Sequence, residues 1–205
     1  MLIAAAALTI GALTLATSLI AKNVLAKNRS TSAAASDDLP AQPMPVTGSP
    51  VSLTSSDGFT YRIAMASASA TASPSGQISA SVDYVLTNTG TKPAFLGPPY
   101  PGDLFLPSTK LPDADRTACA TRGVVEKPYC TPKTSSEVIA RLGPSGRLIV
   151  DRGDRYLPAG GSYLIRVTAT LNAGARISGD DLRLKIWQRR FDQDGRNIDV
   201  PVPRT

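Results

Sequence analysis

The chain has 205 residues, which is enough for one folded domain with tails, or at most two small domains. It contains no histidine, and this excludes a Ser-His-Asp triad, a histidine metal site and a histidine pH switch. Half of the net charge of +6 comes from Lys22, Lys27 and Arg29. The other charges are spread along the chain rather than clustered, so we expect no nucleic-acid binding. Aromatic content is only 5%, which predicts a mainly aliphatic core.

The N-terminal segment is apolar. Residues 2–21 carry no charge and, as a helix, would span the roughly 30 Å core of a bilayer. We therefore predict a hydrophobic helix within residues 1–26, acting as a single-pass membrane anchor or as a signal segment. Val24-Leu25-Ala26 is a candidate cleavage site, and cleavage would release a secreted protein.

The sequence carries opposing signals for the membrane orientation of this segment. The cations that follow the apolar run favour a cytoplasmic domain. The two cysteines and the Ser/Ala/Pro-rich stretch over residues 27–50 are more typical of an exported chain. We expect an extracytoplasmic domain at the cell membrane. Residues 27–50 have too few core-forming residues to fold, so we predict a disordered, flexible linker and a folded domain over residues 51–205.

The first predicted strands cover residues 51–54, 59–65 and 78–88. In the third, Ile78, Ala80, Val82, Tyr84 and Leu86 alternate with polar residues, the pattern of a half-buried strand. The turn signal at residues 73–76 predicts an antiparallel hairpin between the second and third strands.

Residues 91–118 are rich in proline, which excludes central strands over most of this stretch. Phe95-Leu96 and Leu104-Phe105-Leu106 are predicted as short edge pieces. Phe95, Tyr100 and Phe105 are candidate binding residues of a recognition loop. The alternative, which we favour, is that these aromatic side chains pack the long loop onto the domain.

Cys119 and Cys130 are the only cysteines. Their spacing does not form a C-x-x-C redox motif, and a metal site would need further ligands that the chain lacks. In an exported domain they most simply form one structural disulfide.

Further strands are predicted over residues 136–142, 147–150, 163–171, 182–187 and 198–202, with turn signals between them. Strands at this spacing, with no helical period after residue 50, predict an all-β fold: an antiparallel β-sandwich of about seven to nine strands.

Two motifs carry a resemblance to a known family. The chain reads Thr-Asn-Thr-Gly-Thr-Lys-Pro over residues 87–93 and Leu-Pro-Ala-Gly-Gly-Ser-Tyr-Leu-Ile-Arg-Val over residues 157–167. This pairing resembles immunoglobulin-like domains of exported or membrane-anchored bacterial proteins, many of uncharacterised function. The resemblance implies an immunoglobulin-like sandwich over residues 51–202 and carries no catalytic residue.

Four groups of charged residues are candidate sites. Asp192, Asp194 and Asp199 form a weak calcium candidate, but the glycine and glutamate positions of an EF-hand loop do not match. Paired carboxylates for acid–base chemistry occur at Asp151 with Asp154 and at Asp180 with Asp181, each beside a turn. Arg183, Lys185, Arg189 and Arg190 could bind an anionic polymer or lipid, but the outer face of a strand explains them more simply.

The sequence therefore predicts a non-catalytic, membrane-tethered module that binds an envelope protein or a cell-wall component, without a cofactor. An exported hydrolase or calcium-dependent enzyme that uses the late-turn aspartates is the alternative from another class. A purely structural domain of an envelope complex is the third.

Overall fold

The computed structural model describes residues 38–118, 129–172 and 175–203, all within one compact unit that begins at residue 37. The predicted anchor or signal segment at residues 1–26 lies outside the described residues. In the described ranges, no helix is long and apolar enough to cross a membrane.

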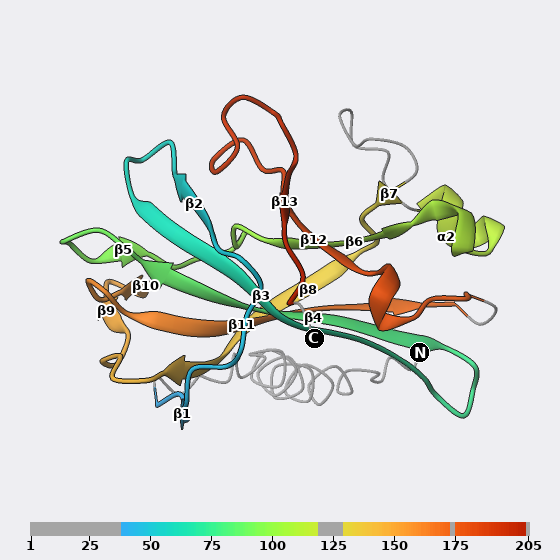
Figure 1. Ribbon diagram of the computed structural model, residues 1–205, viewed down its shortest axis with the longest axis horizontal. Helices are drawn as coiled ribbons and strands as arrows, with labels where there is room; N and C mark the ends of the chain where they lie inside the picture. Colours follow the sequence, from blue (N-terminus) through green and yellow to red (C-terminus); the bar gives the residue numbers. More distant parts are fainter. Residues whose placement is uncertain (1–37, 119–128, 173–174, 204–205) are drawn as a thin grey trace, which may run out of the picture. The chain divides into compact units, whose positions relative to one another are not determined.

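The largest sheet has six strands in the order β1-β8-β11-β4-β3-β2. The strands are β1 (Ala41–Gln42), β2 (Val51–Thr54), β3 (Thr60–Ala72), β4 (Ile78–Asn88), β8 (Thr134–Leu142) and β11 (Ser162–Leu171). All neighbours are antiparallel except β1 and β8, which are parallel. Figure 1 shows the long strands β3, β4 and β11 running side by side.

Two smaller sheets complete the unit. One has the order β13-β12-β6-β7 and the other the order β5-β10-β9. Their strands are β5 (Ala94–Phe95), β6 (Asp103–Pro107), β7 (Tyr129–Cys130), β9 (Ile149–Asp151), β10 (Asp154–Leu157), β12 (Arg183–Ile186) and β13 (Ile198–Val200). The short helical elements are η1 (Ser108–Lys110), α2 (Asp113–Ala118) and η2 (Gly179–Asp181).

One hydrophobic core lies between the six-stranded and the four-stranded sheets. Tyr84 of β4 and Ile165 of β11 belong to the same buried cluster as Leu104 of β6 and Leu184 of β12. All four are fully buried. Packing two sheets by their apolar faces excludes water from both, which is consistent with a β-sandwich.

The predicted hairpin is confirmed. β3 and β4 pair in antiparallel register from Tyr61 with Asn88 to Ala72 with Ile78. Their turn is closed by a hydrogen bond from the Ser73 amide to the Gln77 carbonyl, and Gly76 has a φ of 80°, which suits glycine. The alternating face of β4 is buried in the core, as its period of two predicted.

The described residues contain thirteen strands, more than the seven to nine predicted. β7 and β10 were missed because they are too short for a period to appear. The second half of β3 was not predicted because the side chains of residues 66–72 are small and give no clear alternation. Its backbone is nevertheless paired with β4.

The predicted flexible linker is wrong for residues 38–50. β1 pairs with Arg141 and Leu142 of β8, and the Gly48 amide donates to the Met65 carbonyl at 2.9 Å. A Cβ on Gly48 would lie 2.1 Å from the carbonyl oxygen of Pro201, so this segment is closely packed. Backbone hydrogen bonds and close contact hold it, and neither depends on apolar composition.

The proline-rich stretch also differs from expectation. β6 lies inside the four-stranded sheet between β12 and β7, not at an edge. Its only proline, Pro107, is the last residue of the strand and lies beyond the three residues that pair with β12, so that ladder is left intact. α2 is a short helix where only loop was expected. The largest fully buried side chains include Tyr61, Tyr84, Tyr163 and Phe105, so the few aromatic residues are concentrated inside.

The buried tyrosines predict a loss of stability at alkaline pH. Burial raises the pKa of Tyr61 to about 12 and raises the pKa values of Tyr84, Tyr100 and Tyr163 as well. The phenols of the unfolded chain ionise near pH 10, whereas these stay neutral in the folded chain. The contribution of Tyr61 to the free energy of unfolding is therefore complete below pH 10 and is lost as the pH rises from 10 to 12. The contributions of the other three tyrosines also begin to be lost above pH 10.

Tyr61→Phe tests this expectation by urea unfolding at pH 8 to 12. The variant lacks the hydrogen bond from the Tyr61 hydroxyl to the Phe95 carbonyl, so it should be less stable at neutral pH. Because its ring cannot ionise, its deficit relative to the wild type should shrink above pH 10. A deficit that stays constant to pH 12 would contradict the assignment.

Candidate binding groove

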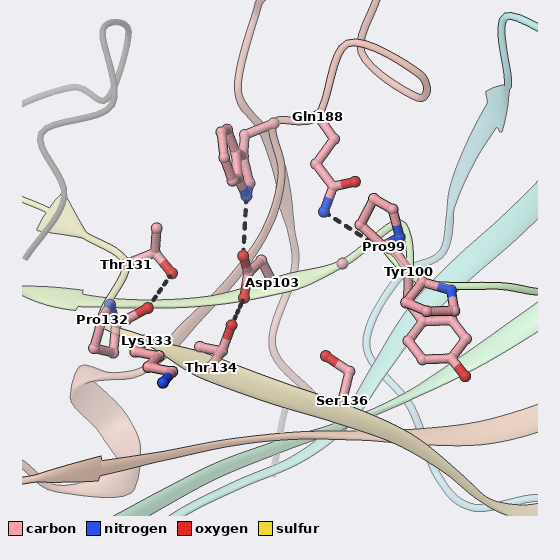
Figure 2. Close-up of a pocket in the computed structure, with 12 residues that line it drawn as sticks. Pro99, Tyr100, Asp103, Thr131, Pro132, Lys133, Thr134, Ser136 and Gln188 are labelled. Carbon is pink, nitrogen blue, oxygen red and sulfur yellow. Dashed lines mark hydrogen bonds between the residues drawn. The ribbon is translucent and has the colours of Figure 1, made fainter.

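The candidate site is a groove of about 470 Å³ beside the four-stranded sheet, which we call the Pro–Trp groove. Three segments far apart in sequence form it: the loop before β6, the connection from β7 into β8, and the residues that follow β12. Its lining residues are Pro98, Pro99, Tyr100, Gly102, Asp103, Thr131, Pro132, Lys133, Thr134, Ser136, Trp187 and Gln188. Figure 2 shows these side chains.

Asp103 connects the three segments. Its Oδ2 accepts a hydrogen bond from Trp187 Nε1 at 3.2 Å, and its Oδ1 accepts one from Thr134 Oγ1 at 2.9 Å. The same Oδ1 accepts the Leu104 amide at 2.9 Å. Since Asp103 begins β6 and is half-buried, this carboxylate fixes the indole ring against the sheet.

Gln188 joins the groove to the proline-rich loop. Its Nε2 donates to the Tyr100 carbonyl at 3.2 Å, while its Oε1 is buried and has no partner in the part of the chain that the structure describes. Tyr100 is only 5% exposed, and its hydroxyl accepts a hydrogen bond from Arg155 Nη2 at 3.3 Å. Burial raises the pKa of Tyr100, so this ring is a neutral anchor of the loop.

The open side of the groove mixes apolar and polar groups. Pro98, Pro99, Lys133 and Ser136 are exposed, and Trp187 is half-buried. Figure 2 shows the Ser136 hydroxyl pointing toward the space between Asp103 and Tyr100. No nucleophile paired with a base lines the groove, because its one carboxylate is already bound to three donors. Such a surface can bind a ligand by stacking and hydrogen bonding.

The three predicted aromatic candidates lie in different environments. Phe105 is fully buried and packs edge-on against Trp187, with ring centroids 6.5 Å apart. Tyr100 is buried and lines the Pro–Trp groove. Phe95 is half-buried against Tyr156, at 5.8 Å between centroids. The favoured alternative, in which these rings pack the loop onto the domain, agrees with these contacts.

The basic residues of the candidate stripe are divided: Arg183 and Lys185 lie over the Tyr129 ring, whereas Arg190 lies over the Phe95 ring. The favoured explanation, a solvated outer strand face, is wrong for Lys185. Lys185 is buried, at 3% exposure, and pairs with Asp199 at 3.1 Å. Arg190 pairs with Asp57 at 2.8 Å and lies over the Phe95 ring. Arg189 is exposed and donates to the Gln193 carbonyl at 3.2 Å. Arg183 donates to the carbonyls of Asp180 and Leu182 and lies over Tyr129.

The calcium candidates are also apart. Asp192 is buried and accepts the Asn197 amide at 2.7 Å, Asp194 pairs with Arg196, and Asp199 pairs with Lys185. Within the described residues, no three His, Cys, Asp or Glu side chains are grouped so that they could hold a metal ion.

The paired carboxylates occupy two separate surface turns. Asp151 and Asp154 face each other across the β9–β10 hairpin and are exposed. Asp181 accepts hydrogen bonds from Lys110 and Ser178, with Asp180 beside it in η2.

Cys130 is buried in β7, and no free cysteine occurs in the described residues. Its predicted partner Cys119 lies outside the described residues, so the disulfide stays a prediction.

A second cavity of about 740 Å³ lies near η2 and β13. Arg183 and Lys185 line it together with Asp180 and Asp199, so its charges offset one another. The Pro–Trp groove is the stronger candidate because its polar groups converge on an open space.

The sequence did not identify Asp103, Lys133, Trp187 or Gln188 as site residues. The one available signal was that Trp187, the only tryptophan, ends an alternating strand where an outward polar residue was expected. Comparison of the chain with protein-family models, curated proteins and solved structures gives no match.

Proposed function

We propose that this chain is a non-catalytic, extracytoplasmic immunoglobulin-like module, tethered to the membrane by its N-terminal segment, that binds a protein or cell-envelope component in the Pro–Trp groove. The observation that carries the proposal is the convergence of three separate segments on one open groove through Asp103. The apolar run at residues 2–21 and the two cysteines support the membrane placement and the exported location.

The alternative of an exported hydrolase or calcium-dependent enzyme has less support. Asp192, Asp194 and Asp199 each bind a different protein group, so they do not share a site. Asp151 and Asp154 are exposed at a hairpin turn, and neither lines the Pro–Trp groove.

Cross-linking tests the binding function. A photoreactive amino acid replaces Ser136 in the full chain, expressed in a host that exports it, and the cross-linked species are analysed after irradiation of intact cells. The matched control carries the same group at Thr170, which is exposed on β11. We expect one defined adduct from position 136 that is absent from position 170 and is lost in Trp187→Ala.

The location needs its own measurement. Two reporters are fused separately after Thr205. A reporter that works only outside the cytoplasm should be active, and a reporter that works only in the cytoplasm should be inactive. The reverse pattern of reporter activity, or equal cross-linking from positions 136 and 170, would contradict the proposal.

The disulfide gives a further prediction. Joining Cys119 and Cys130 constrains the unfolded chain, so Cys119→Ser combined with Cys130→Ser should lower the free energy of unfolding by roughly 3 kcal/mol. Thiol counting on the denatured, exported protein provides the check, with the reduced wild type as control. Two reactive thiols before reduction would contradict the predicted pairing.

A further inference from the structure

We propose that the ligand of the Pro–Trp groove is a saccharide, and that one with a carboxylate binds more tightly than a neutral one. This inference rests on the proposed binding function and names the class of ligand. The volume of about 470 Å³ lies within the range of small-molecule sites and suits a short oligosaccharide better than a folded partner.

The apolar part of the groove can hold the C–H face of a sugar ring. Pro98 and Pro99 are exposed rings that line the groove together with Trp187, a half-buried indole. The indole is already fixed by its hydrogen bond to Asp103 and its edge contact with Phe105. A ring held in place before binding loses little conformational freedom when a ligand stacks on it.

The polar part is rich in acceptors. The two oxygens of Asp103 offer about four acceptor positions, and the three protein donors leave one unused. Because Thr134 donates its proton to Asp103, its oxygen is available to accept. Ser136 adds an exposed hydroxyl. A ligand with several adjacent hydroxyl donors matches this arrangement.

The same contacts argue against a proline-rich peptide. Such a peptide has few N–H donors, and its carbonyls need donors from the groove. The indole donor, Trp187 Nε1, is directed at Asp103, which leaves Ser136 and Lys133 as the exposed donors of the groove. The groove therefore fits a polyol better than an extended peptide.

Lys133 selects for charge. It lines the groove and is exposed, and none of the ion pairs found in the described part of the chain involves it. Its ammonium can pair with a carboxylate on the ligand. Since the pair would be exposed, its effect on affinity should be modest and should weaken with added salt.

The test uses the fluorescence of Trp187, the only tryptophan of the chain. The intact protein is titrated with oligogalacturonate and with the N-acetylglucosaminyl-N-acetylmuramic acid disaccharide as acidic saccharides. Maltotriose and chitotriose serve as neutral ones, and a decaproline peptide serves as the competing class. We expect saturable changes in emission with the saccharides, stronger for the acidic pair at low salt, and none with decaproline.

Three variants localise the ligand. Ser136→Ala should weaken every saccharide about fivefold, as expected for one lost hydrogen bond. Lys133→Gln should weaken only the acidic saccharides, by about threefold, which corresponds to a surface ion pair. Ser135→Ala is the matched control, since its hydroxyl is paired with Thr168 Oγ1 at 2.8 Å. Thermal unfolding of each variant confirms that the fold is unchanged.

The outcomes separate this inference from the proposed function. A defined protein adduct at position 136 without any saccharide response would overturn the saccharide and keep the binding function. Absence of both would overturn both. Tight binding of decaproline, or a saccharide response that Ser136→Ala and Lys133→Gln leave unchanged, would also overturn the saccharide assignment.

Discussion

Asn88→Ala should lower the free energy of unfolding by about 4 kcal/mol. Asn88 is 1% exposed at the end of β4, and its Nδ2 lies within hydrogen-bond distance of the carbonyls of Lys92, Leu157 and Pro158, at 2.8 to 3.2 Å. Its Oδ1 accepts the Gly90 amide at 2.9 Å. Truncation would remove these four hydrogen-bond contacts, of which the one to the Leu157 carbonyl is buried and the others are partly buried, and the lost bonds together with this desolvation cost are the source of the large effect.

Two further variants make the expectation specific. Thr89→Ala changes the exposed neighbour and should stay within about 0.5 kcal/mol of the wild type in urea unfolding. Asn88→Asp keeps the acceptor for Gly90 but places a carboxylate against carbonyl oxygens, so it should be at least as destabilising as Asn88→Ala. If Asn88→Ala and Thr89→Ala were equally stable, Asn88 would have no special role.

Phe105→Ala should lower the free energy of unfolding by about 4 kcal/mol. The ring is fully buried, so truncation removes its transfer free energy and leaves a cavity beside Trp187. Phe105→Leu keeps most of the volume and should cost much less. Both values come from urea unfolding followed by circular dichroism and by Trp187 fluorescence.

The effect of Phe105 on binding should follow from its packing. Phe105→Leu should retain saccharide binding within a few fold, because the hydrogen bond from Trp187 to Asp103 still fixes the indole. The matched control is Phe95→Ala, which truncates a half-buried ring and should be less destabilising than Phe105→Ala. A fully stable Phe105→Ala protein that has lost its ligand would instead make Phe105 a direct contact.

Asn88 also explains how two predicted motifs are related. The sequence paired residues 87–93 with residues 157–167 only by resemblance. In the structure the Asn88 amide donates to the Gly161 carbonyl at 3.0 Å, and the Gly160 amide donates to the Asn88 carbonyl at 3.0 Å. The two motifs therefore meet because β4 and β11 are neighbours, and the asparagine side chain ties one turn to the other.

The sequence by itself determined the all-β class, the β3–β4 hairpin and the buried face of β4. These follow from local rules: a period of two places alternate side chains on one face, and glycine at a tight turn reverses the chain. Such rules act over a few residues and need no knowledge of distant segments. They did not extend to residues 38–50, where hydrogen bonds to β8 and β3 order a stretch whose composition suggested a linker.

Only the tertiary structure decided which polar and aromatic groups are available for function. Phe105 and Tyr100 are both buried aromatic residues of the proline-rich stretch, yet only Tyr100 lines the groove. Asp103, Thr134 and Trp187 come together because β6 lies beside β12 and the chain after β7 turns past Asp103 into β8. Contacts between residues this far apart depend on how the sheets pair, and no local pattern encodes that pairing.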